Sequence, residues 1–233
     1  MKKSNDNDIP KLWELNPVWD VLTPEEKQLI DENSVVYCFK KNEIIHHEGD
    51  TPTHMMMLID GKIRVSKDGV SNRSQIIRLL KPYDFFGYRA IIAGDTYNTT
   101  VSAFEASMAY YVKKEIFLKL LQTNVKFCFL FMQEMARDLG QSDARSVNLT
   151  QKHIRGRLAE ALLSLKEKYG LDEDMATLSM YMSREDLANL SSMTTSNAIR
   201  TLSDFANEGI LSVDGRKIKI LEEDQLIRIS RLG

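Results

Sequence analysis

Apolar and polar residues follow two different periods along the chain. From Ser34 to about Val112, apolar positions recur with a period of two, and turn residues such as Gly49, Gly61 and Pro82 interrupt them. The predicted strands are Val35–Phe39, Glu43–Ile45, Met55–Ile59, Lys62–Val65, Gln75–Leu80, Thr99–Ala103 and Met108–Val112. Short strands at this spacing are typical of a β-sandwich or jelly roll. The run Met55–Met57 is interpreted as core filling, because methionine adapts to irregular gaps.

Beyond Lys114 the period lengthens to that of an α-helix, and the pattern predicts a helix to about Asn148 with a break at Thr123–Asn124. Its residues Cys128, Met132, Met135 and Leu139 keep the four-three-four spacing of a coiled-coil seam. This seam favours a dimerisation helix, with Phe127 and Phe131 packing back on the sheet. A helix buried against its own domain is the competing interpretation. We expect the hinge at Asn148-Leu149-Thr150.

The segment from Ser183 to Leu211 contains two short helical patterns joined by a tight link. Ser183 and Thr194 are N-cap candidates about eleven residues apart, and Gly209 has the place of a glycine just past a helix end. The link is Ser191-Ser192-Met193, and the apolar residues of the second helix are Ala198, Ile199, Leu202 and Phe205. This arrangement predicts a helix-turn-helix, whose second helix can enter a DNA major groove.

A hairpin pattern follows directly. Ile210–Val213 and Arg216–Ile220 flank an expected turn at Asp214-Gly215, and the return strand alternates basic and apolar residues, so that one face presents Lys217 and Lys219. A helix-turn-helix followed by a basic hairpin is a winged helix. Two capped helices at this spacing also occur in proteins that never bind nucleic acid. The basic hairpin makes the prediction of a DNA-binding domain more specific. Ile154–Leu165 predicts a supporting helix that ends at Gly170, and Asp224–Leu232 a short final helix.

Composition narrows the function classes. The chain has 233 residues, 43% of them hydrophobic, with no apolar run long enough for a membrane helix and no secretory signal after Met1. We therefore expect a cytoplasmic protein. Cys38 and Cys128 are isolated, which favours buried free thiols, and no cysteine cluster supports a metal site. The histidines His46 and His47 fall in an expected turn, which disfavours haem.

Two further whole-chain observations concern catalysis and charge. The chain lacks a nucleophile elbow, a GxxxxGK phosphate loop and an HExxH pair, so an enzyme is not expected. Its net charge of −2 argues mildly against DNA binding, because phosphate neutralisation supplies much of the affinity. That charge leaves open a second interpretation, in which an effector-binding module docks its C-terminal domain onto protein.

The order of these features resembles the Crp/Fnr (catabolite-activator and fumarate–nitrate regulator) family from about Leu22 to Leu232. In the front half, the resemblance rests on Glu48-Gly49-Asp50, on Gly61 within LIDGKIRV and on Phe86-Gly87. In the back half it rests on SREDLANL, Arg200-Thr201-Leu202, Glu208-Gly209-Ile210 and GRKIKI. It implies an α+β fold with a cyclic-nucleotide-binding-like β-roll in residues 1–112, a long dimerisation helix and hinge in 113–149, and a winged helix-turn-helix in 150–233. It also implies a homodimer that binds double-stranded DNA and acts with RNA polymerase.

The phosphate-binding cassette departs from the family pattern. In cyclic-AMP binders a Glu follows Phe-Gly and contacts the ribose, and about ten residues later an Arg pairs with the phosphate. Here Tyr88 and Asn98 stand at those positions, so we expect little or no cyclic-AMP binding and no cofactor. The candidate pocket for another effector comprises Gly87, Tyr88, Arg89, Asn98, Thr99 and Thr100. For Arg89 we favour a surface position or a carboxylate partner.

The recognition helix departs from the best-known members as well. Ser196 stands where they place a Glu, whereas Arg200 matches the family's helical arginine and predicts a guanine contact. The operator of those members is therefore not expected here. The candidate DNA-binding residues are Ser183, Arg184, Thr194, Thr195, Ser196, Asn197, Arg200, Arg216 and Lys217.

Overall fold

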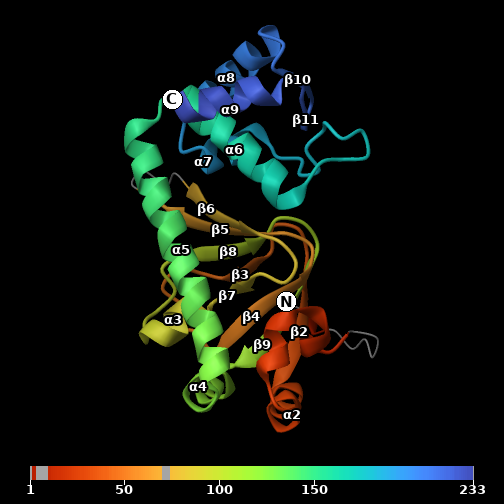
Figure 1. Cartoon of the computed structure of the whole chain (residues 1–233), viewed down its shortest axis with the longest axis vertical. Helices are drawn as coiled ribbons and strands as arrows, with labels where there is room; N and C mark the ends of the chain where they lie inside the picture. The colour runs from red at the N-terminus through yellow and green to blue at the C-terminus, as the bar shows by residue number, and fades with distance from the viewer. Residues whose placement is uncertain (1, 4–9, 70–73, 233) are drawn as a thin grey trace. The chain divides into compact units, whose positions relative to one another are not determined.

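The computed structural model describes residues 2–3, 10–69 and 74–232, which form two compact units. The first unit comprises residues up to 67 together with 77–140, and the second comprises 68–76 together with 141–233 (Figure 1). None of the helices in these ranges is both long and apolar enough to cross a membrane.

The first unit is a sandwich of two antiparallel sheets (Figure 1). One sheet has the order β1-β2-β9-β4-β7 and the other β3-β8-β5-β6. The strands are β1 (Lys2–Lys3), β2 (Ser34–Phe39), β3 (Ile44–His46), β4 (His54–Asp60), β5 (Ile63–Asp68), β6 (Ser74–Leu80), β7 (Phe85–Phe86), β8 (Thr100–Ala103) and β9 (Ser107–Lys113). All seven predicted strands are confirmed, with ends that differ by at most three residues.

The strand β4 is apolar on both faces because its sheet is covered on both sides. Met55 and Met57 belong to the core under the helices, while Met56 and Leu58 belong to the core between the two sheets. Successive residues of a strand point to opposite faces, so an uninterrupted apolar run such as Met55–Leu58 is compatible with a strand that is buried on both faces. The interpretation of Met55–Met57 as core filling is confirmed.

Helices cover the outer face of this sheet: α1 (Leu12–Leu15), a 3₁₀ helix (Pro17–Val21), α2 (Pro24–Glu32), α4 (Lys114–Thr123) and the start of α5 (Val125–Gln151). Phe127 and Phe131 are fully buried there beside Trp19 and Phe117, which confirms their expected packing. The expected break is confirmed at Asn124, whose side-chain oxygen accepts a hydrogen bond of 3.0 Å from the Phe127 amide.

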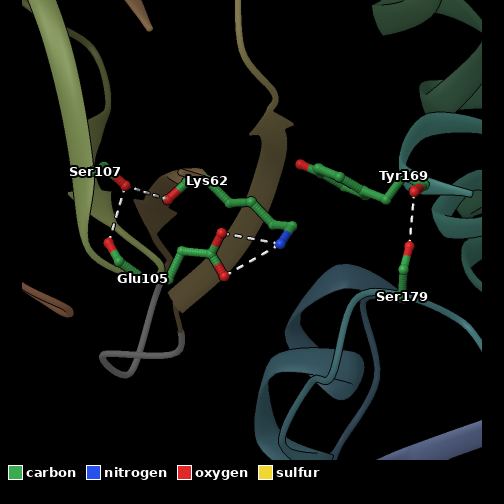
Figure 2. A network of polar contacts seen from close by, with 5 residues as sticks. All are labelled: Lys62, Glu105, Ser107, Tyr169 and Ser179. Carbon is green, nitrogen blue, oxygen red and sulfur yellow. Dashed lines mark hydrogen bonds and ion pairs between the residues drawn. The ribbon is translucent and has the colours of Figure 1, made fainter. Parts of the chain in front are cut away.

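A glycine turn fixes the connection between β4 and β5. Gly61 has φ +85°, and a Cβ there would lie 2.4 Å from the Ala106 carbonyl oxygen, so only glycine fits. The Ser107 hydroxyl donates to the carbonyls of Lys62 and Glu105, and the Lys62 ammonium pairs with the Glu105 carboxylate at 2.9 Å (Figure 2). These contacts hold the β4–β5 and β8–β9 turns together.

The second unit is a winged helix-turn-helix, with one supporting helix before it in the sequence and another after it. It comprises α6 (Ile154–Tyr169), α7 (Arg184–Leu190), α8 (Thr195–Asn207), β10 (Leu211–Asp214), β11 (Lys217–Ile220) and α9 (Glu223–Leu232). Its core includes Leu158, Leu162, Leu187, Leu202 and Phe205, all nearly inaccessible. The Ser179 hydroxyl donates to the Tyr169 carbonyl at 2.7 Å, which holds the end of α6 (Figure 2).

Three local expectations need correction. The expected hinge at Asn148-Leu149-Thr150 is helical, because α5 continues to Gln151 and the chain leaves the helix at Lys152–His153. Asp214 pairs with Lys217 in the hairpin, so the turn residues are Gly215-Arg216 rather than Asp214-Gly215. Cys38 and Cys128 are free, as expected, but half-buried rather than buried.

Candidate nucleic-acid interface and sensor cavity

Both helices of the helix-turn-helix begin at the predicted caps. The Ser183 hydroxyl accepts a hydrogen bond of 3.0 Å from the Asp186 amide and donates to the Asp186 carboxylate at 2.6 Å. The Thr194 hydroxyl accepts a hydrogen bond of 3.2 Å from the Asn197 amide. Each cap satisfies an amide that the first helical turn would leave without a partner. Both hydroxyls are therefore engaged within the protein.

The link between the helices is as short as predicted. Ser192 has φ +53°, and the Met193 amide donates to the Ala188 carbonyl at 3.0 Å. A left-handed residue turns the chain sharply, which brings α8 against α7 without a longer loop.

The first two turns of α8 present polar groups to solvent. Thr195, Ser196 and Arg200 are exposed and Asn197 is half-buried, whereas Ala198, Leu202 and Phe205 face the core. Ile199 was predicted with the apolar residues of this helix, but it is 46% exposed because it lies to one side of the face that carries Ala198, Leu202 and Phe205. An apolar side chain on this face can contact a thymine methyl group.

The wing is tied to α7 by an arginine. The Arg184 guanidinium donates to the Gly215 carbonyl at 2.7 Å, which positions the turn of the hairpin. Arg216 and Lys217 are exposed, while the Lys219 ammonium lies 3.2 Å from the Asp174 carboxylate. Hydrogen bonds from Thr177 and Ala176 hold the pKa of Asp174 well below its usual range, so this carboxylate stays ionised. Arg184 thus has a positioning contact that the sequence does not indicate.

A second arginine holds the far end of α8. Arg155 makes two hydrogen bonds of 2.7 Å to the Glu208 carboxylate and lies over the Phe205 ring at 4.7 Å from its centre. This hydrogen bonding raises the pKa of Arg155 and lowers the pKa of Glu208. The recognition helix is therefore fixed at both ends.

The seam residues of α5 face solvent in the single chain. Met132 is 58% exposed and Leu139 64%, and Met135 is also exposed, while Cys128 is half-buried. Val125 and Phe129 extend the apolar stripe toward the start of the helix. Phe127 and Phe131 are buried on the adjoining flank of the helix, so one side of α5 packs in the core while the seam faces solvent. Exposed apolar stripes of this kind mark protein–protein contacts.

The six cassette residues have different surroundings. Gly87 has φ +78° and caps α3 (Tyr88–Ala93). The Tyr88 hydroxyl donates to the Asp138 carboxylate on α5 at 2.8 Å, and Arg78 pairs with the same carboxylate. Burial, together with the charge of Asp138, raises the pKa of Tyr88, so it stays protonated. Tyr88 thus links α3 to α5.

The remaining cassette residues lie nearer the surface. Arg89 and Asn98 are exposed, and Thr99 and Thr100 are half-buried. The Asn98 carbonyl accepts a hydrogen bond of 2.9 Å from Lys67, and the Thr100 hydroxyl accepts one of 3.1 Å from the Glu48 amide. Arg89 lies at the surface, which is one of the two positions that we favoured for it.

The β-roll contains a cavity of about 440 Å³ that the sequence interpretation missed. It is lined by Tyr37, Ile45, His46, Asp50, Thr51, Thr53, His54, Met56, Tyr97 and Tyr111. None of the six cassette residues is among them. His46 was expected in a turn, but it is a buried residue of β3 because the strand runs one residue further than its apolar pattern. The sequence offered one signal for this cavity, namely a tyrosine in each of two predicted strands, Tyr37 and Tyr111.

A β-roll, a long helix with an exposed apolar stripe and a winged helix-turn-helix define the class of regulators that join a sensor domain to a DNA-binding domain. Two family models match: the cyclic nucleotide-binding domain over residues 37–124 and the Crp-like helix-turn-helix domain over residues 156–229. The chain belongs to the Crp/Fnr family of DNA-binding transcriptional regulators. Members of this family act as dimers.

Similar proteins of known name agree with this assignment. The chain is 20% identical over 194 residues to the CRP-like cAMP-activated global transcriptional regulator of Mycobacterium tuberculosis, which covers 83% of this chain and 87% of that protein. The structure is similar to a putative Crp/Fnr regulator from Eubacterium rectale (TM-score 0.78, 20% identity, 94% of this chain and 99% of that chain). It is also similar to FixK2 from Bradyrhizobium japonicum (TM-score 0.76, 22% identity, 84% and 96%).

Proposed function

We propose that the protein is a cytoplasmic homodimer that reads a two-fold DNA operator through α8, responds to an effector other than cyclic AMP, and acts with RNA polymerase. It works by binding, without a catalytic step. The observation that carries the proposal is the exposed first half of α8. Thr195, Ser196 and Arg200 project from a helix whose two ends are fixed by Thr194 and Arg155.

These side chains suit base recognition. Arginine binds guanine with two hydrogen bonds, asparagine binds adenine in the same way, and serine and threonine bond to bases or phosphates. Arg216 and Lys217 at the wing supply positive charge beside this helix for the DNA backbone. Amides at the start of α8 offer a further phosphate contact.

The stripe on α5 supports the homodimer. Met132, Met135 and Leu139 are exposed at helical spacing, and a second copy of the same helix would remove them from water. A dimer places two recognition helices on two half-sites, which is how regulators of this shape read symmetric operators.

The cassette supports an effector other than cyclic AMP. The name of the Mycobacterium relative says that cAMP activates it. In this chain Tyr88 is committed to Asp138, and Asn98 offers no positive charge to a phosphate. A cyclic phosphate would therefore lose its charge-assisted hydrogen bonds.

An operator selection tests the proposal. The purified full-length protein is incubated with random double-stranded DNA, and bound sequences are recovered and sequenced over several rounds. We expect a two-fold motif whose half-sites are about one helical turn apart. Failure to enrich any motif, with binding that is independent of sequence, would overturn the proposal.

A further inference from the structure

The exposed face of α8 carries one apolar side chain among polar ones. The structure describes every residue of this helix, and Ile199 is the only large hydrophobic side chain of α8 that is exposed. The exposed residues around it, one turn away or adjacent in the sequence, are Thr195, Ser196, Arg200 and Ser203. Ile199 therefore belongs to the surface that we propose for DNA binding, and it differs in chemistry from the rest of that surface.

The packing of α8 does not require an isoleucine at this position. Ala198, Leu202 and Phe205 form the buried face of the helix. Isoleucine is also a poorer helix former than alanine, lysine or glutamate, because its β-branched side chain loses rotamer freedom. Single exposed apolar residues are common on protein surfaces, so the position of Ile199, rather than its exposure alone, points to a role.

Ile199 lies in the part of the helix that meets base edges. The N-terminal residues of a recognition helix contact bases in the major groove, and Ile199 comes only four residues after Thr195, the first residue of α8. Residues three and four apart are neighbours on a helix surface, so Ile199 adjoins Ser196 and Thr195. Arg200, the predicted guanine contact, is the next residue along the chain. A helix that places Ser196 and Arg200 in the groove also brings Ile199 to the base edges.

The side chain of Ile199 has little freedom to lose on binding. A β-branched side chain in a helix has one strongly preferred χ1 rotamer. The helix itself is fixed by the Thr194 cap at its start and by the Arg155–Glu208 pair at its end. The Ser203 hydroxyl donates to the Ile199 carbonyl at 3.0 Å, so this exposed neighbour uses its proton within the helix. Ile199 is therefore a rigid apolar group, and rigid groups bind at a smaller entropic cost.

The chemistry of the major groove leaves one partner for such a group. The edges of adenine, guanine and cytosine present hydrogen-bonding atoms there, whereas thymine adds a 5-methyl group. An isoleucine against an amino or carbonyl group would remove that group from water without offering it a hydrogen bond. Against a thymine methyl group, it buries two apolar surfaces instead. Ile199 thus favours a T·A base pair over the other pairs.

We propose that Ile199 recognises a thymine in each half of the operator through contact with its 5-methyl group. It acts as a specificity-determining residue whose side chain neither donates nor accepts a hydrogen bond. The inference rests on the proposed DNA-binding function, and it adds to that function the type of base that this position of α8 selects. Arg200 and Ile199 then recognise different features of the groove, a guanine edge and a methyl group.

Deoxyuridine tests this contact, because it differs from thymidine only in lacking the 5-methyl group. The operator recovered in the selection above is synthesised with deoxyuridine in place of one thymidine of a half-site at a time. The affinity of the full-length protein for each operator is measured by fluorescence anisotropy. We expect one of these replacements to lower the affinity about three- to fivefold, the value for one buried methyl group. Every base pair keeps its hydrogen-bonding groups, so the other base contacts are unchanged.

Two variants assign the methyl contact to a residue. Ile199→Ala should bind the thymidine and deoxyuridine operators equally, and it should keep its affinity for unrelated DNA because the phosphate contacts remain. Thr195→Ser is the matched control, since it removes the methyl group of the adjoining exposed threonine and keeps the hydroxyl. We expect Thr195→Ser to retain the discrimination between the two operators. Both positions are exposed, so both variants should fold as the wild type does, which circular dichroism verifies.

The outcomes separate this inference from the proposed function. Enrichment of no operator would overturn the proposed function and this inference with it. An operator whose half-sites contain no thymine, or whose affinity is unaffected by deoxyuridine at every thymidine, would overturn the role of Ile199 and leave the proposed function intact. A loss that is equally large in Ile199→Ala would assign the methyl contact to another residue, which also overturns that role.

Discussion

Arg200 projects from the exposed face of α8 without being needed for its packing. We expect Arg200→Ala to weaken binding to the selected operator by about 1–3 kcal/mol and to relax the base preference at one position of each half-site. Fluorescence anisotropy with operator and single-base variants measures both effects. Arg228→Ala is the matched control, because it removes the same charge from an exposed position on α9. Equal losses in the two variants would contradict a base-specific role.

The hydroxyl of Thr194 has a structural role that can be separated from that of its neighbour. It caps α8, whereas Thr195 is the first, exposed residue of the helix. We expect Thr194→Ala to lower the free energy of unfolding of the winged helix by about 0.5–2 kcal/mol and Thr195→Ala to change it by much less. Urea unfolding followed by circular dichroism provides the comparison. A larger effect at Thr195 would mean that the cap is not the source of stability.

His46 makes the β-roll sensitive to acid. Because burial lowers its folded-state pKa to about 4, below the usual 6.5, the unfolded chain binds the extra proton between these values. Stability is therefore lost as pH falls from about 6.5 toward 4, by about 2 kcal/mol between pH 7 and pH 5. Both tryptophans, Trp13 and Trp19, belong to the first unit, so tryptophan fluorescence in urea reports its unfolding.

His46→Phe is expected to remove this contribution to the pH dependence while keeping a ring against Tyr97. The exposed His47→Phe serves as the comparison and retains it. An unchanged pH slope in His46→Phe would show that another group controls acid stability.

Single residues also show where sequence reasoning succeeds and where it fails. Caps and turns depend on neighbours within four positions, so Ser183, Thr194 and Gly209 could be placed from the sequence. The cavity depends on residues from 37 to 111 that meet only across two sheets. Tyr88 illustrates the same limit, because its partner Asp138 lies fifty positions away. Long-range partners leave no trace in local periodicity.

At the level of elements, α5 has two apolar faces with different roles. Phe127 and Phe131 pack under the helices of the first unit, while Met132 and Leu139 face solvent. The two faces could be separated from the sequence because their residues differ in phase along the helix. The length of the helix could not, since the polar residues Asn148 and Thr150 look like a linker but remain helical. Thr150 bonds to the carbonyls of Ser146 and Val147, which lets a turn-forming residue stay within the helix.

The exposed stripe yields a prediction about assembly. A glutamate at Leu139 would meet its own copy across a homodimer seam, so we expect Leu139→Glu to shift the protein from dimer to monomer in sedimentation equilibrium. Gln141→Glu adds the same charge at an exposed position outside the seam and should remain dimeric. Since Leu139 is 64% exposed in the single chain, its replacement should leave the fold of the chain intact. A dimeric Leu139→Glu would place the interface elsewhere.

At the scale of the whole molecule, the net charge is −2, so the protein as a whole does not attract DNA. DNA binding must then depend on positive charge that is concentrated at the DNA-contacting surface. Arg200, Arg216 and Lys217 lie on α8 and at the wing, and on a dimer each of them would occur twice. The strength of DNA binding is then set by how many phosphates this small set neutralises. That number can be measured, because each neutralised phosphate contributes about −0.9 to the slope of log affinity against log salt.

The salt slope also distinguishes DNA from protein as the partner of the winged helix. We expect a steep negative slope for the dimer on its operator, and a slope that is shallower by about two for Lys217→Ala, since a homodimer loses one phosphate contact in each half.

Leu139→Glu should lower operator affinity far more than affinity for unrelated DNA. A monomer on a single half-site keeps the phosphate contacts of one chain, but it lacks the second recognition helix. Anisotropy titrations between 50 and 200 mM salt give both quantities. A flat slope would instead favour a protein partner, and an unchanged slope in Lys217→Ala would remove the wing from the interface.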